Sequence, residues 1–183
     1  MYMDFEFQPL LKNELIRIQP LQSADFETLY AVASDPLIWE QHPNKSRCQR
    51  PVFENFFRGA MESGGAFLVY DAGKDCVIGS SRYTELDQKN NSVSIGYTFL
   101  ARDHWGGAYN PALKTLMLDH AFRFVNEVVF KIGSNNIRSQ KAIERLGAIK
   151  TGEADIVYFG EEAKPNFLYS IFKTDWISRK HPG

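Results

Sequence analysis

Residues 92–124 restrict the folds open to this chain more than any other segment. The stretch SVSIGYTFL (92–100) alternates as a strand does, and apolar residues then recur with helical spacing from about 111 to 124. Between them lies the segment Trp-Gly-Gly-Ala-Tyr-Asn (105–110), although a much shorter turn would join a strand to a helix. We therefore expect a strand, a long glycine-containing loop and a helix in direct succession.

The remaining patterns give the order of the elements. Strand patterns cover 14–20, 66–71, 76–86, 128–133, 149–159 and 166–173, and helical patterns cover 24–33, 51–61 and 136–147. Ser23 is a suitable cap for the first helix, and residues 72–75 (Ala-Gly-Lys-Asp) form a suitable hairpin turn. Three meandering strands followed by alternating helices and strands predict a mixed α/β (α+β) sheet. This order excludes a helical bundle and a doubly wound fold.

The composition is that of one folded domain with a sizeable core. The chain has 183 residues, 44% hydrophobic and 23% charged, close to the values for globular proteins. A net charge of -1 gives no reason to expect a nucleic acid or an anionic membrane as partner, and no apolar run has the length of a membrane span or a signal peptide. Cys48 and Cys76 are expected as reduced thiols, and the histidines form no metal-binding motif. We therefore expect a cytoplasmic protein without a metal site.

The helix after the loop has a defined start. Asn110 is a favoured N-cap and Pro111 a favoured first helical residue, while Lys114 and Asp119 are expected away from the apolar face. Unpaired amides and the helix dipole favour an anion at such a start, and glycines let the backbone approach a ligand closely. The loop is therefore a candidate phosphate site, with a plain turn at Gly106–Gly107 as the alternative. It lacks the Gly-Lys-Ser/Thr ending of a nucleotide P-loop and does not read GxGxxG.

A second strand–loop–helix junction follows. Asn136 is a suitable cap for the next helix, and Gly147 is a suitable stop. Plain capping also accounts for Asn136 and for Ser139 in the first turn. Because the two junctions are consecutive, we expect both helix starts near one edge of the sheet.

The segments IGSSRYTEL, IGYTFL, WGGAYN and NxRSxxAIxRLGA occur here in the order and spacing of the GCN5-related N-acetyltransferases (GNAT). The chain resembles this superfamily from about Leu15 to Trp176, most strongly over 78–148. Within it the chain resembles the ribosomal-protein N-terminal acetyltransferases (RimJ/RimL-like) and their small-molecule relatives. The resemblance implies a single domain over 1–183 with a core at about 14–176. Its fold would be a mostly antiparallel sheet of about seven strands, splayed at the fourth and fifth strands and flanked by about four helices.

The resemblance also implies acetyl-coenzyme A as cosubstrate. The family's central strand opens at a bulge and offers backbone groups to the pantetheine arm, which corresponds here to Thr98, Phe99 and Leu100. The next loop holds the pyrophosphate with backbone amides and corresponds to Trp105, Gly106, Gly107, Ala108, Tyr109 and Asn110. Asn136 and Ser139 lie beside the cofactor arm. On this interpretation the loop is long because it holds a pyrophosphate.

Two features depart from the family pattern. In the loop, Ala108 replaces the usual glycine and Asn110 the usual small residue. Alanine still permits a close approach to a ligand where its φ is negative. Ser94 stands where many relatives carry an acid, just before Ile-Gly-Tyr, and this excludes a base at that position.

Acetyl transfer to an amine requires a base for the amine, stabilisation of the oxyanion and an acid for the departing thiolate. Ser139 matches the hydroxyl residue of the family's NxxS segment and is the candidate acid, with an ordinary first-turn residue as the alternative. Glu85, at the end of the third strand, is the first candidate base, acting through water. Glu153 and Asp155 on the penultimate strand are its rivals. Neither cysteine has a nearby histidine, so direct attack is expected.

The acceptor is expected to be a primary amine, either a protein N-terminus or a small molecule. Arg82, Tyr83 and the aromatic-rich segment 39–57 are candidates for its cleft. Two other functions stay open: a non-catalytic acyl-coenzyme A-binding or sensing module, and a nucleotide or sugar-phosphate enzyme that uses the same anion site. The sequence also leaves a homodimer open.

Overall fold

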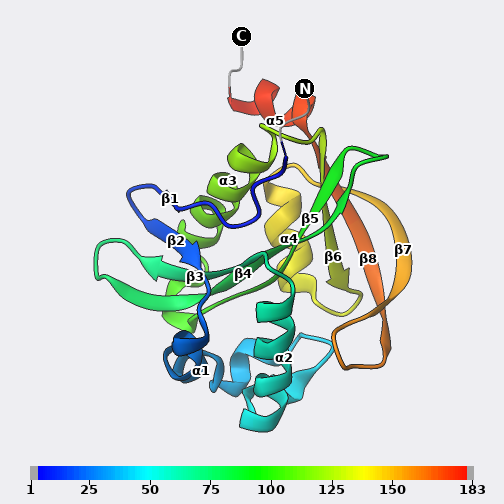
Figure 1. Cartoon of the computed structure of the whole chain (residues 1–183). Coiled ribbons are helices and arrows are strands. Elements are labelled where there is room, and N and C mark those ends of the chain that lie inside the picture. The colour runs from blue at the N-terminus through cyan, green and yellow to red at the C-terminus, as the bar shows by residue number, and fades with distance from the viewer. Residues whose placement is uncertain (1–3, 181–183) are drawn as a thin grey trace.

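The computed structural model describes residues 4–180 and has one mixed sheet at its centre (Figure 1). Its strands are β1 (Leu11–Lys12), β2 (Ile16–Pro20), β3 (Ala66–Asp71), β4 (Cys76–Asp87), β5 (Ser92–Leu100), β6 (Glu127–Gly133), β7 (Ile149–Val157) and β8 (Ala163–Phe172). Their order across the sheet is β1-β2-β3-β4-β5-β6-β8-β7. Every neighbouring pair is antiparallel except β5 and β6, which are parallel. The expected mixed, mostly antiparallel sheet is confirmed, with the short β1 as an eighth strand.

The sheet opens between β5 and β6. The two strands pair only over Ser92–Ser94 of β5 and Glu127–Val129 of β6, although β5 continues to Leu100 and β6 to Gly133. Beyond Ser94 the backbone groups that face this gap have no strand partner there. These are the fourth and fifth strands of the sequence patterns, so the splay that the family resemblance implied is confirmed.

A bulge lies in β5 where the gap begins. In the pairing with β4, Ser80 is opposite Phe99 and Arg82 is opposite Gly96, so β5 has one residue more than β4 between these pairs. Tyr97 has a φ of 53° there. A bulge bends its strand and interrupts the ladder, and such bulges often lie next to active sites.

Helices cover both faces of the sheet. They are α1 (Phe26–Ala33), α2 (Arg50–Glu62), α3 (Tyr109–Ala121), α4 (Ile137–Arg145) and α5 (Lys173–Lys180). The main core packs α3 and α4 on one face, through residues such as Ile95, Leu113 and Phe130. A second core packs α1 and α2 on the other face, and these two helices lie together at the lower end of the view in Figure 1. Within residues 4–180, no helix has the length and apolar character that a membrane crossing requires.

The local predictions differ in accuracy. β5 has the predicted bounds, Asn136 accepts a hydrogen bond from the Ser139 amide as an N-cap, and Gly147 has a φ of +98° that favours glycine. The predicted caps at Ser23 and Asn110 were wrong. Ser23 begins a short 3-10 turn before α1, and α3 starts one residue before Asn110, with Ala108 as its N-cap.

Helix α5 was missed because the signal that predicts a helix is weak in it. Only Trp176 of this helix is buried, and one anchoring residue does not produce a periodic apolar pattern. The indole nitrogen of Trp176 donates to Asp119 of α3 at 2.8 Å, so α5 is fixed to the body of the fold by tertiary contacts.

Candidate active site

The loop between β5 and α3 exposes its backbone. Gly106, Gly107 and Ala108 are exposed, and Gly106 has a φ of +72°. Ala108 has a φ of -83°, which meets the condition for a close approach of its backbone to a ligand. Within residues 4–180, none of the amides of these three residues donates a hydrogen bond to another group of the chain. The loop therefore offers free amides at the positive end of a 13-residue helix, which is an arrangement that suits an anion.

A buried carboxylate holds this loop in place. Asp71, at the end of β3, accepts a hydrogen bond from the Tyr109 hydroxyl at 2.9 Å and lies 3.2 Å from Nε2 of His104. Its other oxygen accepts from the amides of Gly73 and Lys74. Burial opposes the charge of Asp71, but these hydrogen bonds outweigh it and lower the pKa of the carboxyl to about 2. Asp71 thus joins the β3–β4 turn to both ends of the glycine loop.

Replacing Asp71 with asparagine should loosen the loop. The side chain keeps its size but loses the negative charge that strengthens the bonds from Tyr109 and His104. We expect the dissociation constant of acetyl-coenzyme A, measured by calorimetry, to rise on the order of tenfold. Asp75→Asn is the matched control, because Asp75 is in the same turn but its side chain is 81% exposed. Equal constants for the two variants would show that Asp71 does not support the ligand site.

The predicted pantetheine residues lie along the open end of β5. Thr98 is half-buried at the bulge, whereas Phe99 and Leu100 are buried. The Phe99 ring packs on Trp39 of the second core at 5.0 Å between centroids. The indole nitrogen of Trp105 donates to the Leu100 carbonyl at 2.8 Å, which ties the start of the loop to the end of the strand.

Lys114 lies on the opposite side of β5 from the second core and is 4% exposed. The prediction that it points away from the apolar face of its helix was wrong. Its Nζ lies 2.5 Å from Oγ1 of Thr98, which is in turn 2.8 Å from Oγ of Ser81. Burial lowers the pKa of the Lys114 amine to about 7. The hydroxyls of Ser81, which is buried, and Thr98, which is half-buried, are the sequence signal that could have indicated a polar partner on the helix.

The second junction lies beside the first. Arg138, in the first turn of α4, places its guanidinium 3.9 Å from the centroid of the Trp105 ring. Its amide donates to Oε1 of Gln41 and its guanidinium to the Ile38 carbonyl. This stacking joins the first turn of α4 to the first residue of the glycine loop, a contact that the sequence analysis did not predict. Ser139 is half-buried next to Arg138, and Asn136 is 9% exposed.

Glu85 is aimed by a second bulge, in β4. Its φ is 52°, and two β4 residues, 85 and 86, are opposite one β5 residue there. Its Oε2 accepts a hydrogen bond from Ser94 at 3.2 Å and forms an ion pair with Lys131 of β6. This carboxylate therefore contacts both β5 and β6, the strands that separate at the gap. Its partner on β5, Ser94, stands where many members of the family that the sequence resembles carry an acid.

A pocket of about 350 Å³ opens at this carboxylate. Its lining comes from β4, β5, β6, β7 and β8, and includes Glu85, Asp87 and Glu127 together with Lys131. Glu153 and Asp155 are not part of this lining. They are exposed on the edge strand β7, and Glu153 is in register with Phe167, which packs on the main core. The structure therefore separates these two rivals from Glu85.

The two predicted cleft residues on β4 are buried. Tyr83 has no exposed surface and donates its hydroxyl to the Met117 carbonyl, so its assignment to a cleft was wrong. Arg82 is 3% exposed, donates to the Gly59 carbonyl of α2 and stacks on Tyr97 at 3.9 Å. Arg82 is thus a contact of the bulge residue and does not line an open cleft.

The family model for the acetyltransferase (GNAT) domain matches residues 16–149. The chain belongs to the GNAT acetyltransferase family. This GNAT chain is 28% identical over 119 residues to "Uncharacterized N-acetyltransferase p20" of Bacillus licheniformis. The match covers 64% of this chain and 64% of that relative, so it spans less than two thirds of the relative's length.

Solved GNAT structures share the fold. A GCN5-related N-acetyltransferase from Brucella melitensis has a TM-score of 0.83 over 97% of this chain and 84% of its own, at 18% identity. RimJ from Mycobacterium smegmatis, in complex with coenzyme A disulfide, has a TM-score of 0.67 over 90% and 89% of the two chains, at 14% identity. The expected GNAT fold is confirmed, and RimJ is among the structural neighbours, as the RimJ/RimL-like resemblance predicts.

In this GNAT chain the segment 39–57 contacts the β7–β8 hairpin through a buried arginine. Arg47 is 1% exposed, and its Nη2 lies 2.8 Å from Oε1 of Glu161 in the hairpin. Its Nη1 lies 3.0 Å from Nε2 of His42, and burial, together with the charge of Arg47, lowers the pKa of His42 well below its usual value. The hairpin is thereby fixed against the second core, which the sequence analysis did not predict.

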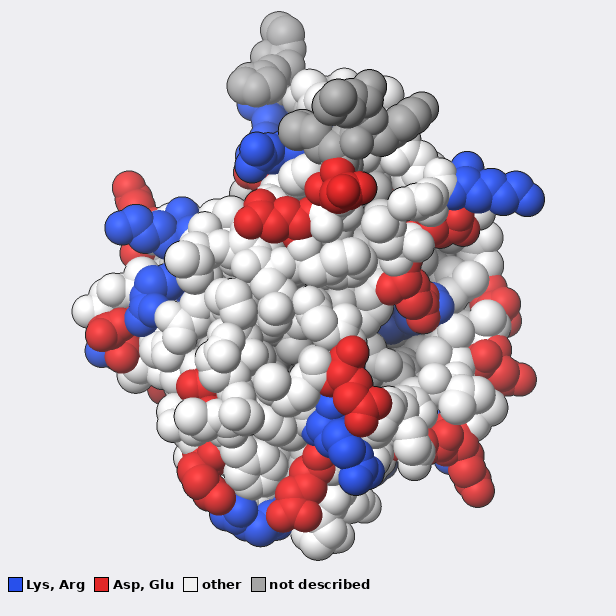
Figure 2. Space-filling model, viewed as in Figure 1, with Lys and Arg blue, Asp and Glu red and all other residues white. Residues whose placement is uncertain are grey.

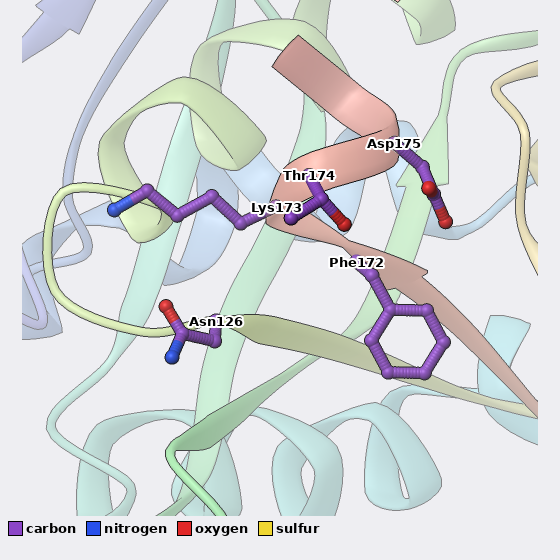
Figure 3. A pocket seen from close by; sticks show the side chains of 5 residues that line it. All are labelled: Asn126, Phe172, Lys173, Thr174 and Asp175. Carbon is purple, nitrogen blue, oxygen red and sulfur yellow. The ribbon is translucent and has the colours of Figure 1, made fainter. Parts of the chain in front are cut away.

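Another cavity, of about 490 Å³, lies where β8 meets α5. Figure 3 shows that Lys173 and Asn126 extend to one side of this junction and Phe172 and Asp175 to the other, so its side chains do not converge on one point. It lies beyond the C-terminal end of α3, whereas the glycine loop lies at the N-terminal end. Within residues 4–180, no cluster of three or more His, Cys, Asp or Glu side chains is placed to hold a metal ion.

Proposed function

We propose that this chain is an acetyl-coenzyme A-dependent N-acetyltransferase that moves an acetyl group to a primary amine by direct attack. One observation carries the proposal: the gap between β5 and β6 runs to a loop of free amides at the start of α3. The amides of a pantetheine arm can pair with an open strand edge as a neighbouring strand does, and a pyrophosphate can accept from free backbone amides. This chain offers both in one continuous path.

Different backbone groups would bind the two parts of acetyl-coenzyme A. The amides of Trp105 to Asn110 would hold the pyrophosphate, and the backbone of Thr98, Phe99 and Leu100 would pair with the pantetheine arm. Asn136 and Ser139, at the start of α4, would flank the arm from the other side of the gap. Acetyl-coenzyme A supplies an activated acyl group with a thiolate as leaving group.

Two side chains are proposed for the proton transfers. Within residues 4–180 the hydroxyl of Ser139 has no hydrogen-bond partner, so it is free to pass its proton to the departing thiolate while its oxygen takes one from solvent. Glu85 takes the proton of the amine through water, because its carboxylate lies over Ser94 at the edge of the gap. The acid that the family usually carries on β5 is thus replaced by one that reaches across from β4.

The pocket at Glu85 favours a protonated amine as acceptor. Three carboxylates and one lysine line it, which attracts a cation before the base removes its proton. The face shown in Figure 2 has acidic and basic side chains interspersed and no continuous basic patch. Small-molecule amines and peptide N-termini both satisfy this requirement.

Acetyl-coenzyme A should raise the melting temperature, and Gly107→Glu should remove most of that increase. A ligand at a hundredfold excess over its Kd stabilises a folded protein by about 2.7 kcal/mol. Apart from its two chain neighbours, no atom of residues 4–180 lies within 4 Å of a Cβ built on Gly107, so the variant is expected to fold. A carboxylate at this place would repel the pyrophosphate. Gly107→Ala, as control, should keep the shift in a thermal melt. A full shift in Gly107→Glu would place the pyrophosphate elsewhere.

Release of free thiol from acetyl-coenzyme A tests the catalytic part of the proposal. The acceptors are amino acids, aminoglycosides, polyamines and N-terminal peptides, each tested against a blank without acceptor. Binding without turnover on any amine would indicate a non-catalytic acyl-coenzyme A module. Equal binding of nucleotides or sugar phosphates, without preference for acyl-coenzyme A, would indicate a different phosphate-binding enzyme.

A further inference from the structure

The bulge in β5 is held by a buried cation on each face of the sheet. On the side of α2, the guanidinium of Arg82 stacks on Tyr97 at 3.9 Å. On the side of α3, Nζ of Lys114 lies 2.5 Å from Oγ1 of Thr98. Within residues 4–180, neither cation forms an ion pair with a carboxylate.

The burial of the Lys114 amine is unusual, because packing alone would favour an apolar side chain at this position. A buried charge is normally paired, and a buried amine without a carboxylate destabilises a fold. A leucine or methionine at this position would extend the apolar stripe of Leu113 and Met117. Its Nζ also lies 5.8 Å from the centroid of the Phe130 ring of β6. The amine therefore has a neighbour on β5 and another on β6, the two strands that separate at the gap.

The hydrogen bonds of Thr98 connect this amine to the backbone of the bulge. When Nζ donates to Oγ1, the hydroxyl proton of Thr98 is directed to Ser81 of β4, at 2.8 Å, or to the Gly96 carbonyl, at 3.4 Å. Both partners lie next to the bulge. The rotamer of Thr98, and with it the backbone from Tyr97 to Phe99, is thus fixed by three groups on α3, β4 and β5.

We propose that Lys114 is a positioning residue for acyl transfer: through Thr98 it fixes the bulge of β5 where the thioester would lie. This inference rests on the proposed function, because it concerns the same gap. A displacement of about 1 Å at a reacting group lowers a rate on the order of 10²-fold. A side chain that stiffens this part of the strand therefore affects turnover more than the affinity for acetyl-coenzyme A, which is dominated by the pyrophosphate.

The test is a double-mutant cycle in the full-length protein. The variants are Lys114→Met, Thr98→Val, the double variant and Thr98→Ser, with Lys12→Met on β1 as a matched control at an exposed lysine. Turnover is measured with the best amine from the thiol-release panel, with acetyl-coenzyme A varied to separate kcat from KM. Thermal melts confirm that every variant is folded at the assay temperature.

We expect kcat of Lys114→Met and of Thr98→Val to fall roughly 10- to 100-fold, with KM for acetyl-coenzyme A changed by less than about threefold. The double variant should be no slower than the slower single variant, since both remove one interaction. Thr98→Ser should restore most of the turnover lost in Thr98→Val, because the hydroxyl is retained.

Three other kinds of outcome would overturn the inference, and each has a different meaning. If wild type is active and kcat of Lys114→Met is unchanged, the amine does not act through Thr98. The same conclusion follows if the losses of kcat in the two single variants multiply in the double variant. Wild type that turns over no amine would overturn the proposed function and this inference with it. A rise in KM with unchanged kcat would make Lys114 a determinant of cosubstrate affinity and would also contradict the proposal.

Discussion

Lys114→Met should stabilise the folded chain by about 2–4 kcal/mol at pH 6, as expected when an apolar residue replaces a buried charge. The cause is the pKa of Lys114, which burial lowers from its usual 10.5 to about 7. Between pH 7 and 10.5 the unfolded state binds this proton and the folded state does not, so wild-type stability should rise with pH over that window. Below pH 7 both states bind it, and the destabilisation is complete. The gain from Met should therefore shrink as the pH approaches 10.

Urea denaturation of wild type and Lys114→Met at pH 6, 8 and 10 measures this difference. Other groups titrate equally in the two proteins, so their contributions cancel in the comparison. Lys12→Met should show no such trend, because Lys12 is exposed. A Met variant that is less stable than wild type at pH 6 would contradict the expectation and would make Lys114 a structural residue. A Lys114→Met variant that is more stable than wild type and has a lower kcat would agree with both predictions for this residue.

Glu85→Gln should lower kcat on the order of 10²-fold or more, which is the usual contribution of a general base. Glutamine keeps the shape of the side chain and an oxygen that can accept from Ser94, but it cannot take a proton. The dissociation constant of acetyl-coenzyme A should not change, because Glu85 lines the proposed acceptor pocket and is not part of the glycine loop. Thiol release gives kcat, and calorimetry gives the affinity.

Glu153→Gln is the matched control, since the Glu153 side chain is 67% exposed and lies on the edge strand. It should retain wild-type turnover. If Glu153→Gln is slow and Glu85→Gln is not, the base lies on β7 and the pocket at Glu85 is not the acceptor site. If neither variant is slow, water or a backbone group removes the proton.

The features that the sequence predicted well depend on neighbouring residues. The bounds of β5 follow from its alternation, and the cap at Asn136 follows from the preference of asparagine for that place. The features that it missed depend on residues far apart in the chain. Arg47 and Glu161 are separated by 114 positions, and nothing near either of them indicates an ion pair.

Lys114 shows the same limit at a single position. It follows Leu113 directly, and a charged residue beside an apolar stripe is ordinarily solvated. Only the pairing of β4 with β5 brings Ser81 and Thr98 together under the helix. Asn110 failed as a predicted cap for a local reason, since the observed N-cap, Ala108, lies two residues earlier in the chain. The site was thus predictable as a loop and a strand, but not as a set of side-chain contacts.

The short parallel contact between β5 and β6 has a mechanical consequence. Within residues 4–180 it divides the sheet into two parts, β1 to β5 and β6 to β8, that share ladder hydrogen bonds only over Ser92–Ser94 of β5. A molecule that lies in the gap and bonds to both edges would serve as a temporary extra strand. In the proposed function the cosubstrate would then stiffen the enzyme while it reacts. When the product dissociates, the two parts of the sheet would again be joined only by this three-residue pairing and could rotate slightly about it.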